Sequence, residues 1–246
     1  MKSYSLLYAN GCSFTNHDPL DQSDKWPENL AKELGIPDYI NDGMSAGTNQ
    51  GIFKRTAKFL TETTVSASDI LAVIQLTYPF RFEMPTPAHK SGWQTYITMA
   101  MGSLQNYESK SKTNKEYYDA RLNAFAEHEC YEAWEFYIQA SAISNLLRAK
   151  GVDSYFLCLE CPEPGLEQPI SGDNKGNLTE LLTFDDDYVN WMFGNTLNSN
   201  MNRLVHQIDM PERSFVVSNI DAHFNGEANR RISKLMAQQI KLKEQL

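Results

Sequence analysis

The segment that most constrains the fold is residues 69–76 (DILAVIQL), which is apolar at nearly every position. A strand with one face in water alternates apolar and polar residues, whereas a strand buried on both faces does not. The run therefore predicts a central strand of a parallel sheet. Such a sheet needs helices on both of its faces, because each face is apolar.

The rest of the chain alternates predicted strands and helices around this run. Short apolar segments predict further strands at residues 5–9, 39–40, 154–159 and 215–217. Helical spacing of apolar residues predicts helices at residues 26–34, 48–61 and 226–246, and one or two within 117–149. With right-handed crossovers, this order predicts a three-layer α/β/α sandwich around a parallel sheet of about five strands, of flavodoxin-like type.

One helix is predicted in more detail. Thr48 or Asn49 would cap the helix at residues 48–61, and Ile52, Phe53, Ala57 and Leu60 would face inward.

Length and composition favour one domain over residues 1–246, since 246 residues with 41% apolar content can bury a large core. The alternation breaks at two places. Residues 78–118 contain Pro79, Pro85 and Pro87 and read as an insertion. Residues 160–202 begin in a stretch rich in Pro, Gly and Asn and read as an irregular region.

Charge and hydropathy bear on partners and location. The net charge of −9, from 22 basic and 31 acidic residues, argues against nucleic acid or an anionic membrane as a partner. No apolar run reaches the roughly 20 residues of a membrane-spanning helix, and residues 6–9 are too short for a signal-peptide core. We expect a cytoplasmic protein whose cysteines, including the Cys158/Cys161 pair, are ordinary thiols.

The carboxyl ends of the predicted strands carry a group of reactive and polar residues. Ser13 follows the first strand, a loop rich in Gly and Asn (residues 41–49) follows the second, and Asp221 and His223 follow the last. Ligands of parallel sheets bind beyond these strand ends. A serine, an Asp/His pair and backbone donors at one edge are the parts of an acyl-transfer site.

These motifs resemble the SGNH (GDSL-like) hydrolases. GCSFT (residues 11–15), NDGMSAGTN (41–49) and DAHFN (221–225) occur in the order of that family's blocks. GCSFT and the Trp26-Pro27 segment resemble family members that include several from bacteriophages. The resemblance implies the SGNH type of fold, with Ser13 as nucleophile, His223 as general base and Asp221 as its orienting partner. It also implies that Ser13 and Gly47 donate backbone N–H groups to an oxyanion.

The chain departs from the family pattern at three positions. Cys12 replaces the aspartate before the serine, Asp and His lie two rather than three residues apart, and no asparagine follows the central strand. Residues i and i+2 of an extended segment project to the same side, so the Asp/His pair can still converge. Asn49, Thr77 or Tyr78 would supply the missing donor. Arg81 either pairs with Glu83 or Asp69, or faces the site and binds an anionic substrate group.

Each candidate also has a purely structural interpretation. Ser13 would be a turn residue or helix cap, Gly47 a turn glycine and Asn49 a cap. His17 and Asp18 lie close to Ser13 in sequence and could touch the pocket without binding a metal, and residues 185–187 lack the spacing of a calcium loop. We therefore expect no metal and no cofactor. The aromatic residues of the irregular segments either wall the pocket or pack on the core: Trp93, Tyr96, Tyr107, Trp191 and Phe193.

The leading hypothesis is a serine esterase that hydrolyses a small acyl ester, for example an O-acetyl group on a carbohydrate, through an acyl-enzyme. The expected partner is such a small-molecule or carbohydrate ester. One alternative is an SGNH-like binding or structural component of a phage particle, which would place the protein in a virion. Another is an acyltransferase of the same fold.

Overall fold

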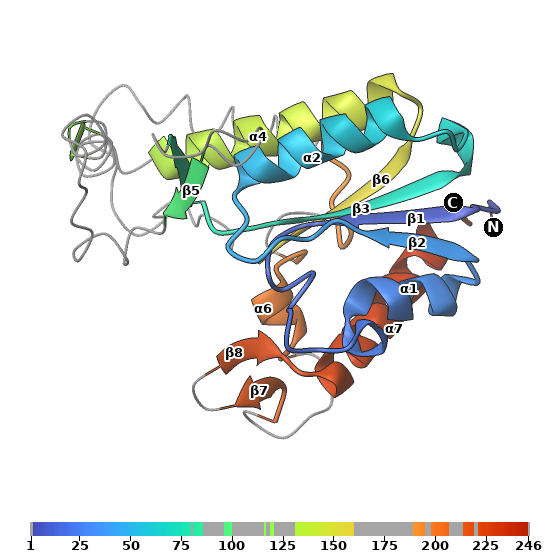
Figure 1. Cartoon of the computed structure of the whole chain (residues 1–246). Coiled ribbons are helices and arrows are strands. Elements are labelled where there is room, and N and C mark those ends of the chain that lie inside the picture. The colour runs from blue at the N-terminus through green and yellow to red at the C-terminus, as the bar shows by residue number, and fades with distance from the viewer. Residues whose placement is uncertain are drawn as a thin grey trace.

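The central sheet is parallel and has the strand order β2-β1-β3-β6 (Figure 1). The computed structural model describes residues 2–79, 81–85, 96–99, 116, 119–120, 131–159, 189–194, 198–206, 214–218 and 221–245. The strands are β1 (Leu6–Asn10), β2 (Asp38–Asn41), β3 (Ile70–Leu76) and β6 (Asp153–Cys158). Every residue of β3 is buried, which confirms the apolar run as a central strand.

Two helical layers cover the sheet. Helices α1 (Trp26–Leu34) and α7 (Gly226–Lys243) pack on one face, and α2 (Asn49–Glu62) and α4 (Tyr131–Ala149) on the other (Figure 1). The side chains of β1 divide between them. Leu7 and Ala9 join the core under α1 and α7, whereas Leu6 and Tyr8 join the core under α2 and α4. This is the three-layer α/β/α arrangement expected from the alternation of strands and helices.

Helix α2 begins as predicted at its cap but differs in its inward face. Thr48 is the N-cap, and its hydroxyl accepts the N–H of Gly51 at 2.9 Å. The buried residues of α2 are Asn49, Gly51, Ile52 and Thr56, whereas Phe53 is 37% exposed. The prediction of Phe53 as an inward residue is therefore wrong, because it lies about 100° around the helix from Ile52.

The prediction of residues 215–217 as the fifth strand of the sheet is wrong. In the structure β7 (Val216–Ser218) pairs antiparallel with β8 (Asp221–Phe224) in a separate two-stranded sheet. Parallel neighbours need a long crossover, whereas two residues between strands permit only a hairpin. The edge of β6 instead meets single bridges from Trp191 and Asn200.

The remaining described elements are short. They are the 3₁₀ helices η1 (Gln22–Asp24) and η2 (Ala67–Asp69), the antiparallel pair β4 (Phe82–Pro85) and β5 (Tyr96–Met99), and α6 (Met201–Leu204). Trp191 is buried against Phe136 and Phe156, and Phe193 packs against the core, which is the second of the two roles considered for these aromatics. Trp93, Tyr107 and the side chain of Tyr96 lie outside the described residues.

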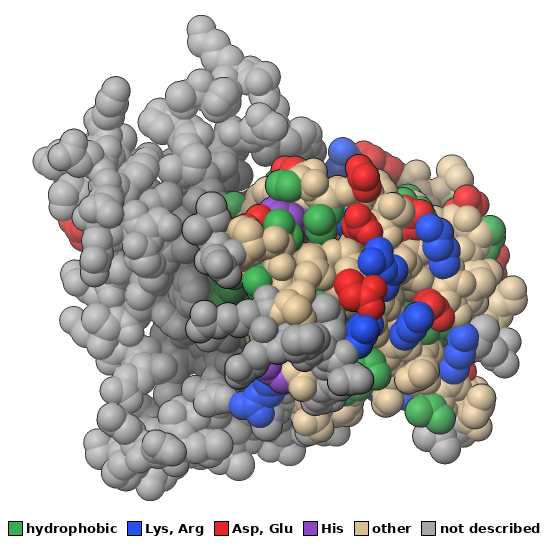
Figure 2. Space-filling model, turned by 90° about the horizontal axis from the view of Figure 1, so that it is seen from below, with side chains coloured by type: hydrophobic (Ala, Val, Ile, Leu, Met, Phe, Trp, Pro, Cys, Tyr) green, Lys and Arg blue, Asp and Glu red, His purple; other side chains and the backbone are tan. Residues whose placement is uncertain are grey.

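The described helices differ from membrane spans in length or hydropathy, and one face of the molecule carries mixed charges. None of them is both long enough and apolar enough to cross a membrane. On the face made by α1 and α7, acidic and basic side chains are interspersed (Figure 2). Several of them form ion pairs, such as Arg230 with Asp24 and Arg231 with Glu227.

Candidate active site

Ser13 lies in a tight turn directly after β1. The N–H groups of Thr15 and Asn16 both donate to the carbonyl of Cys12, at 2.9 and 3.2 Å. Gly11 permits this turn, because a Cβ there would lie 2.1 Å from Thr15 Oγ1. Ser13 is 7% exposed. Ser13 is therefore a turn residue, as its structural interpretation predicts. The same turn places Ser13 just beyond the carboxyl end of β1.

A buried glutamine in the central strand anchors this turn. Gln75 Oε1 accepts the hydroxyl of Thr15 at 2.8 Å and the N–H of Cys12 at 3.4 Å. The Cys12 thiol also contacts Gln75 Oε1 and is fully buried. Sequence reasoning did not single out Gln75, although it is the one amide side chain inside the apolar run DILAVIQL.

Ser13, His223 and Asp221 form a continuous hydrogen-bonded chain. Ser13 Oγ lies 2.8 Å from His223 Nε2, and His223 Nδ1 lies 2.6 Å from Asp221 Oδ1. Asp221 and His223 are partly buried on one side of β8, whereas Ala222 between them is exposed. The extended backbone of β8 thus lets an Asp/His pair two residues apart meet the serine.

The Asp221 carboxylate is strongly stabilised in its charged form. The His223 side chain, and next the His223 backbone N–H at 3.1 Å, donate to it and lower its pKa from 3.8 to about 2. A hydrogen bond from His17 acts in the same direction. Asp221 is therefore a carboxylate wherever His223 could act as a base, and it can stabilise a positive imidazolium.

His17 is the second histidine of the site. Its Nε2 lies 2.9 Å from Asp221 Oδ2, and its ring stacks on the His223 ring with centroids 4.0 Å apart and planes 10° apart. Histidine, cysteine, aspartate and glutamate side chains can bind metal ions. Among the described residues, His17, Asp221 and His223 are the one group of three such side chains close enough to share an ion. Two imidazoles and a carboxylate suit zinc. However, near-parallel rings aim their nitrogen lone pairs along parallel lines, so one ion could bind both only after a ring turned.

Arg55 of α2 bonds both the end of β1 next to Ser13 and the loop after β2. Its guanidinium donates to Asn10 Oδ1, to the Gly11 carbonyl at 3.0 Å and to the Asp42 carbonyl at 2.9 Å. Burial lowers the pKa of Arg55, while neighbouring Asp42 opposes that shift. Sequence reasoning missed this residue, because its partners lie on loops far from it along the chain.

Gly47 lies against the loop that carries Ser13, but its N–H binds a carbonyl of its own loop. That N–H donates to the Met44 carbonyl at 2.9 Å, which closes a turn with Ala46 at φ 56°. A Cβ at Gly47 would lie 3.2 Å from the Gly11 carbonyl, so the two loops approach closely. The structure thus shows the turn-glycine role, and the oxyanion role of Gly47 stays a prediction that requires this hydrogen bond to open.

Asn49, Thr77 and Arg81 form one network beside Gly47. Asn49 is not the cap of α2; its Oδ1 accepts the Thr77 N–H at 2.8 Å. Arg81 donates to Thr77 Oγ1 at 3.1 Å and to the Gly47 carbonyl at 3.4 Å, and it lies over the Tyr78 ring at 4.8 Å. The Glu83 carboxylate instead contacts Thr48 and Lys54. The predicted donors are thus gathered near the loop of Gly47, and none of these hydrogen bonds reaches Ser13.

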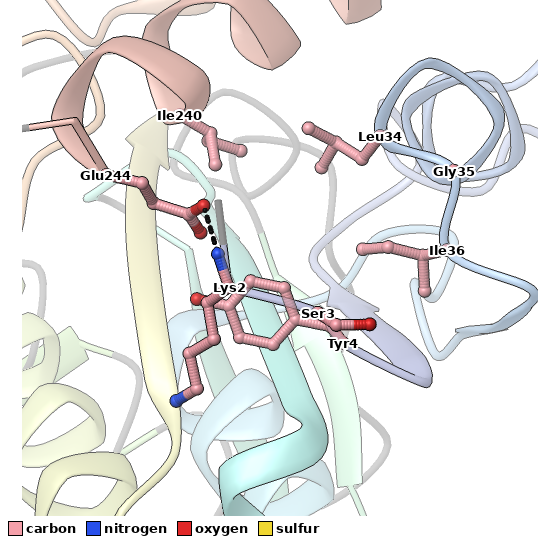
Figure 3. A pocket seen from close by; sticks show the side chains of 8 residues that line it. All are labelled: Lys2, Ser3, Tyr4, Leu34, Gly35, Ile36, Ile240 and Glu244. Atoms are coloured by element: carbon pink, nitrogen blue, oxygen red, sulfur yellow. Dashed lines mark hydrogen bonds between the residues drawn. The ribbon is translucent and has the colours of Figure 1, made fainter.

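A separate cavity lies at the other end of the sheet, where both chain termini are found (Figures 1 and 3). It measures ≈ 200 Å³ and is lined by Lys2, Ser3, Tyr4, Leu34, Gly35, Ile36, Ile240 and Glu244. The backbone N–H of Lys2 donates to Glu244 across it at 3.1 Å. Parallel sheets bind ligands at the carboxyl ends of their strands, so this cavity is remote from the site of Ser13.

Comparison with solved structures places the fold. The chain is similar to TesA, at 14% identity over 96% of this chain and 98% of that one, with a TM-score of 0.53. It is also similar to the psychrotrophic esterase EstA of Pseudoalteromonas sp., at 11% identity over 98% and 100% of the chains, with a TM-score of 0.50. A member of the lipolytic G-D-S-L family from Veillonella parvula is 10% identical over 98% of this chain and 99% of that one, with a TM-score of 0.49. The chain has the α/β/α fold of the SGNH hydrolases.

Sequence comparison gives a family but no described activity. No curated protein matches the chain. A family profile, described as "Family of unknown function (DUF6071)", matches residues 17–168. The matched segment begins at His17 and contains neither Ser13 nor the Asp221/His223 pair. Because it covers more than half of the sequence, this chain belongs to the DUF6071 family.

Proposed function

We propose that this protein is a serine esterase that hydrolyses a small acyl ester through an acyl-enzyme on Ser13. The observation that carries the proposal is the 2.8 Å contact between Ser13 Oγ and His223 Nε2, with Asp221 on the other ring nitrogen. A nucleophile, a base and an orienting group in hydrogen-bond contact are the signature of an activated serine. The shared fold with the esterase EstA is consistent with this chemistry.

The first half of the reaction transfers the acyl group to Ser13. With Asp221 holding the hydrogen on Nδ1, His223 Nε2 accepts the Ser13 proton while Oγ attacks the ester carbonyl carbon. The tetrahedral intermediate then collapses, and His223 gives that proton to the leaving alcohol oxygen. The acyl group remains on Ser13 Oγ.

The second half releases the acid. Water attacks the acyl carbon, gives a proton to His223, and the second tetrahedral intermediate expels Ser13 Oγ, which takes the proton back. Each intermediate carries a negative oxygen that needs donors. Among the described residues no acceptor takes the Ser13 N–H, so this group is available for that role.

Substrate size and class stay a prediction at the level of a small acyl ester. The carbohydrate hypothesis comes from the family resemblance, and aromatic residues that wall the pocket would suit it by stacking on a sugar. Trp191 is buried and Phe193 packs against the core, which leaves Trp93, Tyr96 and Tyr107 as the candidates for such stacking. A panel of aryl acetates, longer aryl esters and O-acetylated sugars would rank these substrates by kcat/KM.

A serine-directed probe tests the proposal. A fluorophosphonate should label the wild-type protein on Ser13, and aryl acetate hydrolysis should fall about 10³-fold or more in Ser13→Ala. Ser66→Ala is a matched control, because Ser66 is an exposed serine before β3. If Ser13 is not labelled and the wild type hydrolyses no faster than Ser13→Ala, the protein is a binding or structural component instead. Acylated product formed from added acceptor alcohols, in place of free acid, would indicate a transferase.

A further inference from the structure

The two oxygens of Asp221 are held by different parts of the chain. Oδ1 accepts both the ring N–H and the backbone N–H of His223, at 2.6 and 3.1 Å. Oδ2 lies 2.9 Å from His17 Nε2, and among the described residues no other donor reaches it. With Oδ1 alone engaged, both hydrogen bonds to the carboxylate would come from His223 itself, and no residue that the structure describes outside β8 would restrain the carboxylate. The contact with His17 therefore fixes its plane.

His17 is well placed to do this because it is itself held on several sides. Its side chain is only 11% exposed, and its ring stacks on His223 at 4.0 Å. Its carbonyl accepts the Leu20 N–H at 3.0 Å, which closes a turn behind the ring. The same short segment carries Ser13 and Phe14, and the Phe14 ring lies 4.6 Å from the His223 ring. Residues 13–17 thus contact the imidazole of His223 at three points.

We propose that His17 is a positioning residue of the esterase site, which donates Nε2–H to Asp221 Oδ2 and so sets the orientation of His223. This inference rests on the proposed function of Ser13. The role requires the neutral ring of His17, because a second positive charge 4.0 Å away would oppose the imidazolium that His223 must become. This role also explains how an Asp/His pair on one short strand stays oriented toward a serine that lies 210 positions away in the sequence.

Two substitutions separate the hydrogen bond from the ring. Glutamine places an amide N–H at about the reach of imidazole Nε2, whereas phenylalanine keeps a stacking ring and loses the donor. His17→Phe should lower kcat about 10- to 100-fold, the effect of a slightly misplaced catalytic group, with KM within about twofold. His17→Gln should retain kcat within about threefold. His206→Phe, a substitution at an exposed histidine, is the matched control and should keep wild-type kcat.

The proposal fails if His17→Phe matches the wild type, or if His17→Gln loses as much kcat as His17→Phe. Thermal unfolding of each variant shows whether it is folded. If His17→Phe does not fold, His17→Asn replaces it, since its amide is one methylene too short to reach Oδ2. A low kcat in His17→Asn beside a high kcat in His17→Gln supports the proposal, and equal values overturn it.

A second readout does not depend on turnover. The proton on His223 Nδ1, hydrogen-bonded to Asp221, should give a downfield NMR signal in the wild type and in His17→Gln. It should broaden or be lost through exchange with water in His17→Phe. An unchanged signal in His17→Phe overturns the positioning role, even if the wild type proves inactive. Inactivity of the wild type with the expected NMR pattern overturns only the proposed function.

Discussion

Asp221 has a pKa that places its protonation far below the working range of an imidazole base. Hydrogen bonds from the side chain and backbone of His223 hold that pKa at about 2. We therefore expect the Asp221 carboxyl carbon to titrate near pH 2 by NMR. A midpoint near the ordinary value of about 3.9 would contradict the hydrogen-bonding scheme.

The same pKa has a consequence for stability. Because the folded-state value lies below that of the unfolded chain, the stabilisation from the charged carboxylate is present above about pH 4 and is lost as the pH falls toward 2. Asp221→Asn lacks this contribution. The stability difference between the two proteins should therefore narrow below pH 4 in denaturant unfolding. A difference that already disappears above pH 5 would show that the carboxylate is not stabilised.

At the scale of residues, the sequence predicted the three candidate groups of the site but not the residues that contact them. Ser13, Asp221 and His223 could be predicted because each follows a strand and fits a motif, and the structure brings them into contact. The contact of His17 with Asp221 joins positions 204 residues apart and depends on how β8 docks against the loop after β1. Nothing local to either residue signals that contact.

At the scale of elements, the turn that carries Ser13 is held by hydrogen bonds to β3. The hydroxyl of Thr15 and the N–H of Cys12 both donate to Gln75 Oε1, and Gln75 is fully buried. In Gln75→Leu these donors would be buried without an acceptor. We expect the free energy of unfolding to fall by about 1–3 kcal/mol, and kcat to fall as the turn of Ser13 loosens.

A double-mutant cycle with Thr15→Val checks this expectation. Removing the hydroxyl of Thr15 together with its acceptor should cost less than the sum of the two single changes, by about 0.5–3 kcal/mol. Denaturant unfolding of the four proteins measures that coupling. Strict additivity would mean that the contact between Thr15 and Gln75 contributes nothing to the turn.

The strand β7 shows why one element escaped prediction. Residues 215–217 are apolar enough for a strand, and the assignment as a strand was close to the observed β7. The choice of partner was wrong, because a short apolar run does not distinguish a parallel neighbour from a hairpin. The two residues between β7 and β8 carried the discriminating information.

At the scale of the whole molecule, the site joins an early segment of the sequence to a late one. Ser13 follows the first strand, whereas Asp221 and His223 lie on a hairpin outside the main sheet (Figure 1). The helix after that hairpin, α7, holds it in place against η1 and α1. Asn229 donates to the carbonyls of Asp24 and Phe224, and Ser233 donates to the carbonyl of Trp26. Docking of α7 therefore fixes the distance between His223 and the serine.

Asn229 offers a test of that docking, since it is buried and bonds both η1 and the residue next to His223. Leucine has a similar volume but donates to neither carbonyl. Asn229→Leu should lower the free energy of unfolding by about 1–3 kcal/mol, because the buried carbonyl of Phe224 and the partly buried carbonyl of Asp24 lose their donor. It should also lower kcat more than it raises KM, because the change displaces His223 rather than the substrate-binding loops. Lys234→Ala, an exposed position on the same helix, should leave both quantities unchanged. Unaltered kcat in a destabilised Asn229→Leu protein would show that the hairpin is held independently of α7.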